Sequence, residues 1–456
     1  MRKIKHIPFF LLVMTVFQVD AQGIHRSTCN GNYARVDSLL TSHPVNVRDS
    51  LQRTPLLYAV GCRRDSLVKM LLERGAAVNV RDTNGLTPIL MAARVNNDEY
   101  VDALFKKNVD PNVVTNNGDT PQHWAAIHGN LSMMKLLVNN KTNLNQKNER
   151  GSTPLEIALR LEYQDIAEFL VEKGADESLV RTFEFSGPYV GQPLPGLEAE
   201  AFAPNFISTE NMEHTASFTP DGKKMYYTLE SRAKGAIIMV TELKDGVWTT
   251  PRASSIEGDY REIDPFVTHD GSALYYTSNR PVKEGDTLDD NFDIWRVKRE
   301  GDRWGKPEHM GANVSSEHPE WFPTLTKTGK MYFTWGGRNS NIAYSELKDG
   351  VYGKPIELPE TVNSEQRDYD PVIDPNERFV IWSSNRDGGF GGSDLYISFK
   401  NEDGTWAPAK NMGEAINTRR GELAPSISHD GKYFFFCRAG DIYWIDMKII
   451  DKLEKL

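Results

Sequence analysis

The chain has 456 residues, of which 25% are charged and 39% hydrophobic, which is typical of a soluble globular protein. Its 63 Asp and Glu outnumber its 53 Lys and Arg, so its formal net charge is −10. This balance excludes a generally basic nucleic-acid-binding protein, because such proteins neutralise phosphates with Lys and Arg.

Residues 1–22 predict a cleaved secretory signal peptide. Basic residues precede an apolar run from Ile7 to Val19, and Ala21 offers a small residue near a cleavage point. The run is too short to span a bilayer comfortably, and no later stretch is long and apolar enough to do so. We therefore expect an exported protein, periplasmic or extracellular, with no transmembrane anchor after cleavage.

A 33-residue repeat follows the predicted signal peptide. The dipeptide Thr-Pro recurs at this spacing, beginning at Thr54, Thr87, Thr120 and Thr153. Each copy predicts the start of a helix, because Thr caps helices and Pro is tolerated at their first position. The pattern resembles ankyrin repeats, which implies a helical solenoid over residues 23–180. We expect four clear repeats and a partial one around Ala34 to Leu40.

The tips between these repeats offer candidate contacts for protein partners, because solenoids bind along such surfaces. The candidates are Arg48, Asp49, Arg81, Asp82, Asn116, Lys147 and Asn148. His123 is the only residue that keeps the His of the ankyrin Thr-Pro phrase, and we expect it to make a structural hydrogen bond.

Cys29 and Cys62 lie 33 residues apart, at nearly equivalent positions of neighbouring repeats. Stacked repeats place such Cα atoms about 10 Å apart, beyond the usual reach of a disulfide. An oxidising compartment nevertheless favours a bond, so the sequence leaves a disulfide and two packed thiols open. The third cysteine, Cys437, lies in an apolar predicted strand, so we expect it to be a core residue.

A different phrase recurs five times after a predicted linker at residues 181–196. Each copy combines a strand, a tight turn and an aromatic strand, at residues 217–228, 266–277, 324–334, 372–382 and 426–436. A third strand follows, and then a fourth segment such as MGANVSSE (310–317) or LPETVNSE (358–365). Four strands in a unit of about 50 residues indicate a blade of a β-propeller.

The last unit lacks its fourth strand, and a matching segment, AFAPNFISTE (201–210), precedes the first unit. Exchange of this strand would close the ring and remove its open edges. The fold class is therefore an α-helical ankyrin solenoid followed by an all-β propeller over residues 197–456, with five blades predicted and six as the alternative.

The propeller phrases, together with SSNRDGGFGGSDLY (383–396), resemble the WD40-like repeats of TolB-type propellers, which occur in secreted bacterial proteins. The resemblance covers residues 187–447. It implies the fold and leaves the activity open, because the group includes binding scaffolds and proteins of other roles.

Alignment of the five phrases on their turns exposes two charged columns. The acidic column comprises Glu213, Glu262, Glu320, Asp368 and Glu422. The basic column comprises Arg232, Arg280, Arg338, Arg386 and Arg438. Five carboxylates at one mouth of the channel would attract a cation. The equal numbers favour the alternative, in which each Arg pairs with one carboxylate and stabilises the blades.

Residues that depart from the repeat are better candidates for a unique binding surface. Asp264 and Asp370 occur in two blades only, where the other blades carry Thr215, Phe322 and Ala424. The candidate channel-mouth residues are His214, Asp264, Glu320, Trp321, Tyr369 and Asp370. Ordinary packing at strand ends is the alternative interpretation.

The sequence favours a non-enzymatic scaffold that binds protein partners of the bacterial cell envelope through both folds. One alternative is a carbohydrate-binding or glycan-cleaving propeller that uses Asp264, Asp370 and Glu320, and another is a small-ligand sensor. The sequence contains no G-x-S-x-G elbow, P-loop or Cys/His metal motif. We expect no cofactor, although Asp387 and Asp394 could hold Ca²⁺ around the glycines at 388–392.

Overall fold

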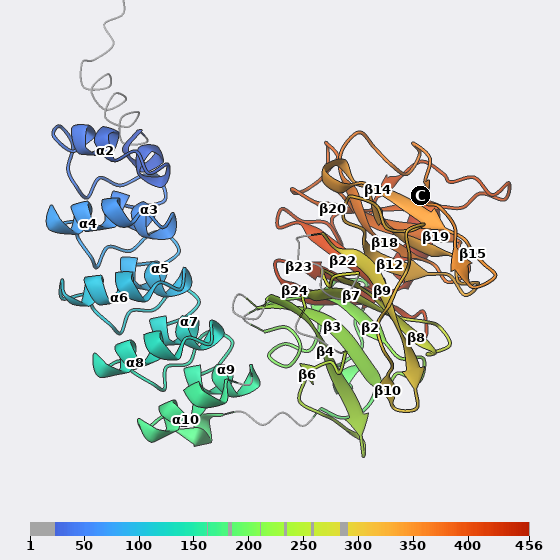
Figure 1. The fold of residues 1–456 in the computed structure, drawn as a ribbon, viewed down its shortest axis with the longest axis horizontal. Helices are drawn as coiled ribbons and strands as arrows, with labels where there is room; N and C mark the ends of the chain where they lie inside the picture. The colour runs from blue at the N-terminus through green and yellow to red at the C-terminus, as the bar shows by residue number, and fades with distance from the viewer. Residues whose placement is uncertain are drawn as a thin grey trace, which may run out of the picture. The chain divides into compact units, whose positions relative to one another are not determined.

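The computed structural model describes residues 23–161, 163–180, 185–209, 211–231, 235–256, 260–282 and 291–455. The chain divides into two compact units near residue 182. Figure 1 shows the helical unit in blue to green and the strand-rich unit in green to red. The predicted signal peptide lies outside the described residues. None of the described helices has the length and apolar character needed to cross a bilayer.

Helix pairs build the N-terminal unit, as the 33-residue spacing predicts (Figure 1). The first helices of successive pairs are α3 (Pro55–Gly61), α5 (Pro88–Arg94), α7 (Pro121–Ile127) and α9 (Pro154–Arg160). The second helices are α4 (Asp65–Glu73), α6 (Asp98–Phe105), α8 (Leu131–Asn139) and α10 (Gln164–Glu172). Each first helix packs on the first helix of the next pair, which makes one continuous layer.

The predicted partial repeat is wrong, because the structure has a complete helix pair there. Residues 23–29 are helical and precede α2 (Tyr33–Leu39). The buried Ile24, Val36 and Leu39 give this pair its own apolar contacts. The first helix of this pair could not be predicted, because it lacks the Thr-Pro dipeptide that marks the others.

Threonine caps begin the first helices, for the reason that the sequence indicates. The hydroxyls of Thr54, Thr120 and Thr153 accept hydrogen bonds from backbone N–H groups three residues later. His123 completes a capping box, because its Nδ1 accepts from the backbone N–H of Thr120 at 3.0 Å. The structural role expected for His123 is therefore confirmed.

A ladder of asparagines joins one repeat to the next. Each asparagine Oδ1 accepts a hydrogen bond, of 2.8 or 2.9 Å, from a backbone N–H 31 residues later. The four asparagines are Asn46, Asn79, Asn112 and Asn145. These bonds give a hydrogen-bond acceptor to backbone N–H groups of the tips that would otherwise have none within the protein.

A disulfide joins Cys29 to Cys62, with their Cα atoms 5.3 Å apart. The expected separation of about 10 Å between stacked repeats is wrong at this position. Both residues lie where a first helix ends and the chain turns, and Cys62 is the residue that follows α3. The bond fixes the first repeat to the second.

Five antiparallel sheets build the C-terminal unit, one for each predicted blade (Figure 1). Blade 1 contains β2 (Met212–Phe218), β3 (Lys224–Ser231), β4 (Gly235–Lys244), β5 (Val247–Trp248) and β6 (Arg252–Ala253). Blade 2 contains β7 (Glu262–Val267), β8 (Ala273–Ser278), β9 (Asp293–Glu300), β10 (Arg303–Trp304) and β11 (Glu308–His309). Blade 3 contains β12 (Trp321–Leu325), β13 (Met331–Trp335), β14 (Asn341–Ser345) and β17 (Ile356–Glu357), with a ribbon of β15 (Leu347–Lys348) and β16 (Val351–Tyr352).

Blades 4 and 5 complete the ring. Blade 4 contains β18 (Asp368–Ile373), β19 (Phe379–Ser384), β20 (Asp394–Phe399) and β21 (Lys410–Asn411). Blade 5 contains β22 (Glu422–Ile427), β23 (Tyr433–Arg438), β24 (Asp441–Asp446) and, from the start of the unit, β1 (Glu200–Ala201). The innermost strands contact each other in the order β2, β7, β12, β18 and β22, and β22 contacts β2. The prediction of five blades closed by strand exchange is confirmed.

The predicted fourth segments are displaced from the fourth strands. In blades 2, 3 and 4 the fourth strand ends just before the predicted segment, at His309, Glu357 and Asn411. The segments themselves bury apolar side chains, namely Val314 in the first, Leu358 and Val362 in the second, and Met412 and Ile416 in the third. They then lead into the innermost strand of the next blade.

The described part of the predicted linker packs against the propeller. Trp248 donates to the carbonyl oxygen atoms of Phe185 and Gly187, each at 2.7 Å. The buried Tyr189 donates to Asp430 at 2.7 Å and lies among aromatic rings of blades 1 and 5. At the opposite end of the unit, α11 (Lys448–Lys455) buries Ile449 and Ile450 against blades 4 and 5.

Candidate functional site

The ankyrin tips contain two kinds of residue. Asp82 and Asn148 are buried, and Asp49 is half-buried. Asp49 and Asp82 each accept backbone N–H bonds from residues two and four positions later, so they shape the tip. The neighbouring Arg48, Arg81, Asn116 and Lys147 are exposed and offer the contacts that the sequence places here.

One position in the first helices forms a stripe along the array. Tyr58, Met91 and Trp124 are 33 residues apart, and each is half-buried. The Tyr58 hydroxyl donates to Asp49 at 2.8 Å, which shows that this position faces the tips. Because α3, α5 and α7 are stacked, these three side chains form a continuous row beside the basic tips. We call this row the concave stripe.

The acidic column of the propeller is buried within the blades. Glu213, Glu320, Asp368 and Glu422 are 0% exposed, and Glu262 is 5% exposed. Four of them accept both a backbone N–H and a hydroxyl from a Ser or Thr four residues earlier; the donors are Thr209, Ser316, Ser364 and Thr418. Each carboxylate is therefore held by its own local segment, which does not favour a shared cation site at the channel mouth.

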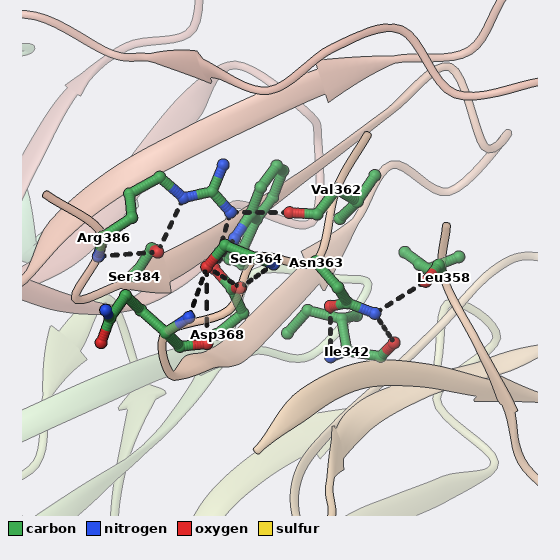
Figure 2. A network of polar contacts seen from close by, with 10 residues as sticks. Ile342, Leu358, Val362, Asn363, Ser364, Asp368, Ser384 and Arg386 are labelled. Atoms are coloured by element: carbon green, nitrogen blue, oxygen red, sulfur yellow. Dashed lines mark hydrogen bonds and ion pairs between the residues drawn. The ribbon is translucent and has the colours of Figure 1, made fainter. Parts of the chain in front are cut away.

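Arginines of the basic column pair with three of these carboxylates. Arg280 pairs with Glu262 at 2.5 Å, Arg386 with Asp368 at 2.8 Å, and Arg438 with Glu422 at 2.9 Å. Figure 2 shows the network in blade 4, where Arg386 also donates to the Val362 carbonyl at 2.6 Å. Arg232 and the side chain of Arg338 lie outside the described residues.

Burial acts strongly on two of these carboxyl groups. It raises the pKa of Glu262 to about 7, although Arg280 acts in the opposite direction. Burial also raises the pKa of Glu320 to about 7, and the Ser316 donors oppose this shift. Glu320 therefore belongs to the structural column, and its contacts are separate from those of the other candidate channel residues.

A β-bulge occurs at the same position of all five innermost strands. The strand register shifts there in every blade, and the residue at the bulge has a φ between +52° and +59°. These residues are Thr215, Asp264, Phe322, Asp370 and Ala424. The bulge takes the residue out of strand alternation and re-aims its side chain.

His214 brings the two unusual aspartates into one buried cluster. Its Nδ1 lies 3.7 Å from Asp264, and its Nε2 lies 3.5 Å from Glu230. Burial raises the pKa of Asp264 to about 6. Burial and the charge of Asp264 raise the pKa of Asp370 to about 7. Burial disfavours the charged form of His214, but the neighbouring carboxylates outweigh it and raise its pKa.

The rings of Trp321 and Tyr369 both lie close to one arginine, Arg367, which the sequence did not indicate. The Arg367 guanidinium lies 5.4 Å from the Trp321 ring centroid and 4.4 Å from that of Tyr369. The Tyr369 hydroxyl donates to Ser393 at 2.6 Å. Arg367 could not be predicted as part of this group, because an arginine near an aromatic residue in the sequence is too common to indicate a contact.

A cavity of about 80 Å³ occupies the centre of the propeller. It extends from the bulges, at Asp264 and Phe322, to the hairpin turns that contain His269 and His429. Of the six predicted channel-mouth residues, Asp264 is the one that lines it. Two carboxylates facing one substrate space, as a glycosidase needs, are therefore not brought together in this cavity.

The glycine-rich loop holds Asp394 by N–H donors. Phe390 and Gly391 donate backbone N–H groups to Asp394, and Asn411 donates its amide at 2.9 Å. Asp387 is exposed on the other side of the glycines. Donors around a carboxylate do not suit Ca²⁺, which needs further oxygen ligands. In the described part of the chain, no cluster of three or more His, Cys, Asp or Glu is placed to hold a metal ion.

Comparison with known proteins identifies the helical unit. Residues 24–115 and 89–180 match the family model for ankyrin repeats. A search of curated proteins found no match to this chain. The matched residues coincide with the stacked helix pairs, so the chain consists of ankyrin repeats followed by a five-bladed β-propeller.

Proposed function

We propose that this protein is a non-enzymatic scaffold of the bacterial cell envelope that binds partner proteins through its ankyrin repeats and its propeller. Ankyrin repeats and propellers are typically non-catalytic folds that recognise proteins. The observation that carries the proposal is the concave stripe of Tyr58, Met91 and Trp124 beside three exposed basic tips.

The chemistry of this surface fits a protein partner. Tyr, Trp and Met are enriched where protein interfaces are buried. Arg48, Arg81 and Lys147 are exposed at equivalent positions, 33 or 66 residues apart, so they add positive charge along one edge. An acidic partner surface would complement that edge and associate faster because of it.

Two features support placement outside the cytoplasm. The apolar segment at residues 7–19 favours export, and the disulfide between Cys29 and Cys62 suits an oxidising compartment. The resemblance of the propeller phrases to TolB-type repeats agrees with a role in the envelope.

Affinity capture with matched variants tests this function. The mature wild-type chain and a Met91→Ala/Trp124→Ala variant would be incubated with cell-envelope extract, and bound proteins quantified by mass spectrometry. Phe169→Ala, a half-buried aromatic on α10, is the control. We expect the stripe variant to capture at least about tenfold less of a stoichiometric partner than the wild type does. Large interface residues of this kind contribute most of the binding energy. Equal capture by all three chains would refute the assigned surface.

A further inference from the structure

The outer edge of a propeller blade can pair with another chain, because its backbone groups are not all bonded within the blade. Segments of this protein contact the outer strands of three blades. Residues 185–187 lie on β5 in blade 1, and Gln192 donates to the Ala201 carbonyl of β1 in blade 5 at 2.9 Å. In blade 4, Lys410 of β21 donates to the Leu453 carbonyl of α11 at 3.4 Å. The remaining edges, those of blades 2 and 3, differ from each other in their side chains.

The first residue of the fourth strand is charged in blades 1, 2 and 4 and apolar in blade 3. The charged residues are Arg252, Glu308 and Lys410. Charges on an edge strand oppose pairing with another chain. In blade 3 this position is Ile356, which is 50% exposed, and the nearby Val351 and Leu347 are 61% and 37% exposed. We call these three residues the apolar edge; they lie at the rim of the strand-rich unit, where Figure 1 labels β15.

Blades 1 and 3 contain the same outer hairpin. Residues 241–248 (TELKDGVW) and 345–352 (SELKDGVY) share the run ELKDGV. Both hairpins have the same register, with Leu243 opposite Trp248 in blade 1 and Leu347 opposite Tyr352 in blade 3. Each turns on an Asp and a Gly with positive φ, as two-residue hairpin turns require. The strands β5 and β16 therefore present equivalent backbone groups at their outer edges.

In blade 1 an extended segment of the chain itself occupies this hairpin. Ser186 forms an antiparallel bridge with Val247, and the Trp248 N–H donates to the Phe185 carbonyl at 2.7 Å. The Trp248 indole donates to the Gly187 carbonyl, also at 2.7 Å. The segment that the hairpin accepts is thus an aromatic residue followed by two small residues.

The equivalent backbone donor in blade 3 is directed outward. The Gly353 N–H donates to the Glu346 carbonyl at 3.0 Å, so the alternation of antiparallel bonds turns the Tyr352 N–H away from β15. No described residue accepts a hydrogen bond from this N–H. The Asn313 amide bonds to the Tyr352 carbonyl at 3.0 Å, and Asn313 is exposed, so its side chain can move aside for an approaching chain. A carbonyl supplied by that chain would satisfy the donor.

We propose that the apolar edge and β16 bind an extended segment of a partner protein, in which an aromatic residue precedes two small residues. The segment adds to blade 3 as residues 185–187 add to blade 1. Its backbone carbonyl accepts from the Tyr352 N–H, and its aromatic ring packs on Val351 and Ile356. Backbone bonds to a sheet edge, combined with side-chain contacts, are a recurring mode of peptide recognition. The proposal rests on the scaffold function proposed above and names the surface that the propeller contributes.

Fluorescence anisotropy of a labelled peptide, titrated with the full chain, tests this surface. The peptide has the sequence of residues 184–190, EFSGPYV. We expect saturable binding by the wild type and at least about tenfold weaker binding by Val351→Arg/Ile356→Glu, which introduces the residues that blade 2 carries at these positions. Val171→Arg, at an exposed apolar residue of α10, should bind like the wild type. A peptide with Phe185→Asp should bind at least about tenfold more weakly.

Hydrogen–deuterium exchange, resolved to single amides, tests the backbone contact in the same complex. We expect the peptide to slow exchange of the Tyr352 amide. Equal binding by the wild type and Val351→Arg/Ile356→Glu, or no saturable binding up to about 1 mM peptide, would overturn the proposal. Binding without slower exchange at Tyr352 would also overturn it. The peptide test involves no residue of the concave stripe, so its failure is distinguishable from failure of the capture experiment.

Discussion

At the residue scale, buried ion pairs stabilise the individual blades of the propeller. Asp368 is 0% exposed and accepts from Ser364, from the Trp382 indole and from Arg386. Burial of a carboxylate is costly, and these donors together compensate for lost water. The Arg–carboxylate pair therefore matters through the penalty of breaking it rather than through a large net gain.

Arg386→Ala should lower the free energy of unfolding by about 3 kcal/mol, because it leaves the Asp368 charge buried with fewer partners. Chemical denaturation of the full chain, followed by tryptophan fluorescence, measures this change. Lys448→Ala removes a pair whose lysine is 75% exposed and should leave the transition almost unchanged. Equal effects of the two substitutions would contradict the assigned role of Arg386.

Asp370→Asn should make the protein more stable at pH 8. The pKa of Asp370 is raised to about 7 in the folded chain, from an ordinary value of 3.8. The folded state therefore holds this proton more tightly, and stability falls as the pH rises from about 4 through about 7. We expect a gain of about 1–3 kcal/mol at pH 8 and none at pH 4. Chemical denaturation of the wild type, Asp370→Asn and the exposed control Asp387→Asn at pH 4 and pH 8 measures this gain. An equal gain in the free energy of unfolding of Asp370→Asn at the two pH values would refute the prediction.

At the scale of elements, the sequence was informative wherever a residue type repeats. The Thr-Pro dipeptides predicted the first helices, and the turn phrases predicted the paired inner strands of every blade. The fourth strands were misplaced because two-residue strands carry no pattern. The cluster of His214 with Asp264 and Asp370 was found partly, since the blades differ there, but the bulges were missed because a left-handed φ at Phe322 leaves no trace in residue type.

The closing strand β1 gives an element-scale prediction. Glu200 and Ala201 pair with β24 and cover its outer edge. A chain that begins at residue 185 keeps this strand, whereas one that begins at residue 211 exposes the edge of β24. The shorter chain should unfold at a lower temperature and associate with itself, because open edges pair. Calorimetry and light scattering on both chains check this; two monomers with equal midpoints would contradict the closure.

At the scale of the whole molecule, two different recognition surfaces share one chain. The ankyrin unit offers an extended row of half-buried side chains with basic tips, which suits a large partner. The propeller has a small central cavity that is lined by one buried carboxyl group, that of Asp264. The disulfide joins the first described ankyrin repeat to the second and restricts the unfolded chain, which stabilises this end of the array.

Hydrogen–deuterium exchange of the full chain with its captured partner tests the scaffold function most directly. Binding on the concave stripe should slow exchange in α3, α5 and α7 and in the tips around Arg48, Arg81 and Lys147. The second helices α4, α6 and α8 should exchange as they do in the free protein. Protection confined to those second helices, or found in the propeller alone, would contradict the account.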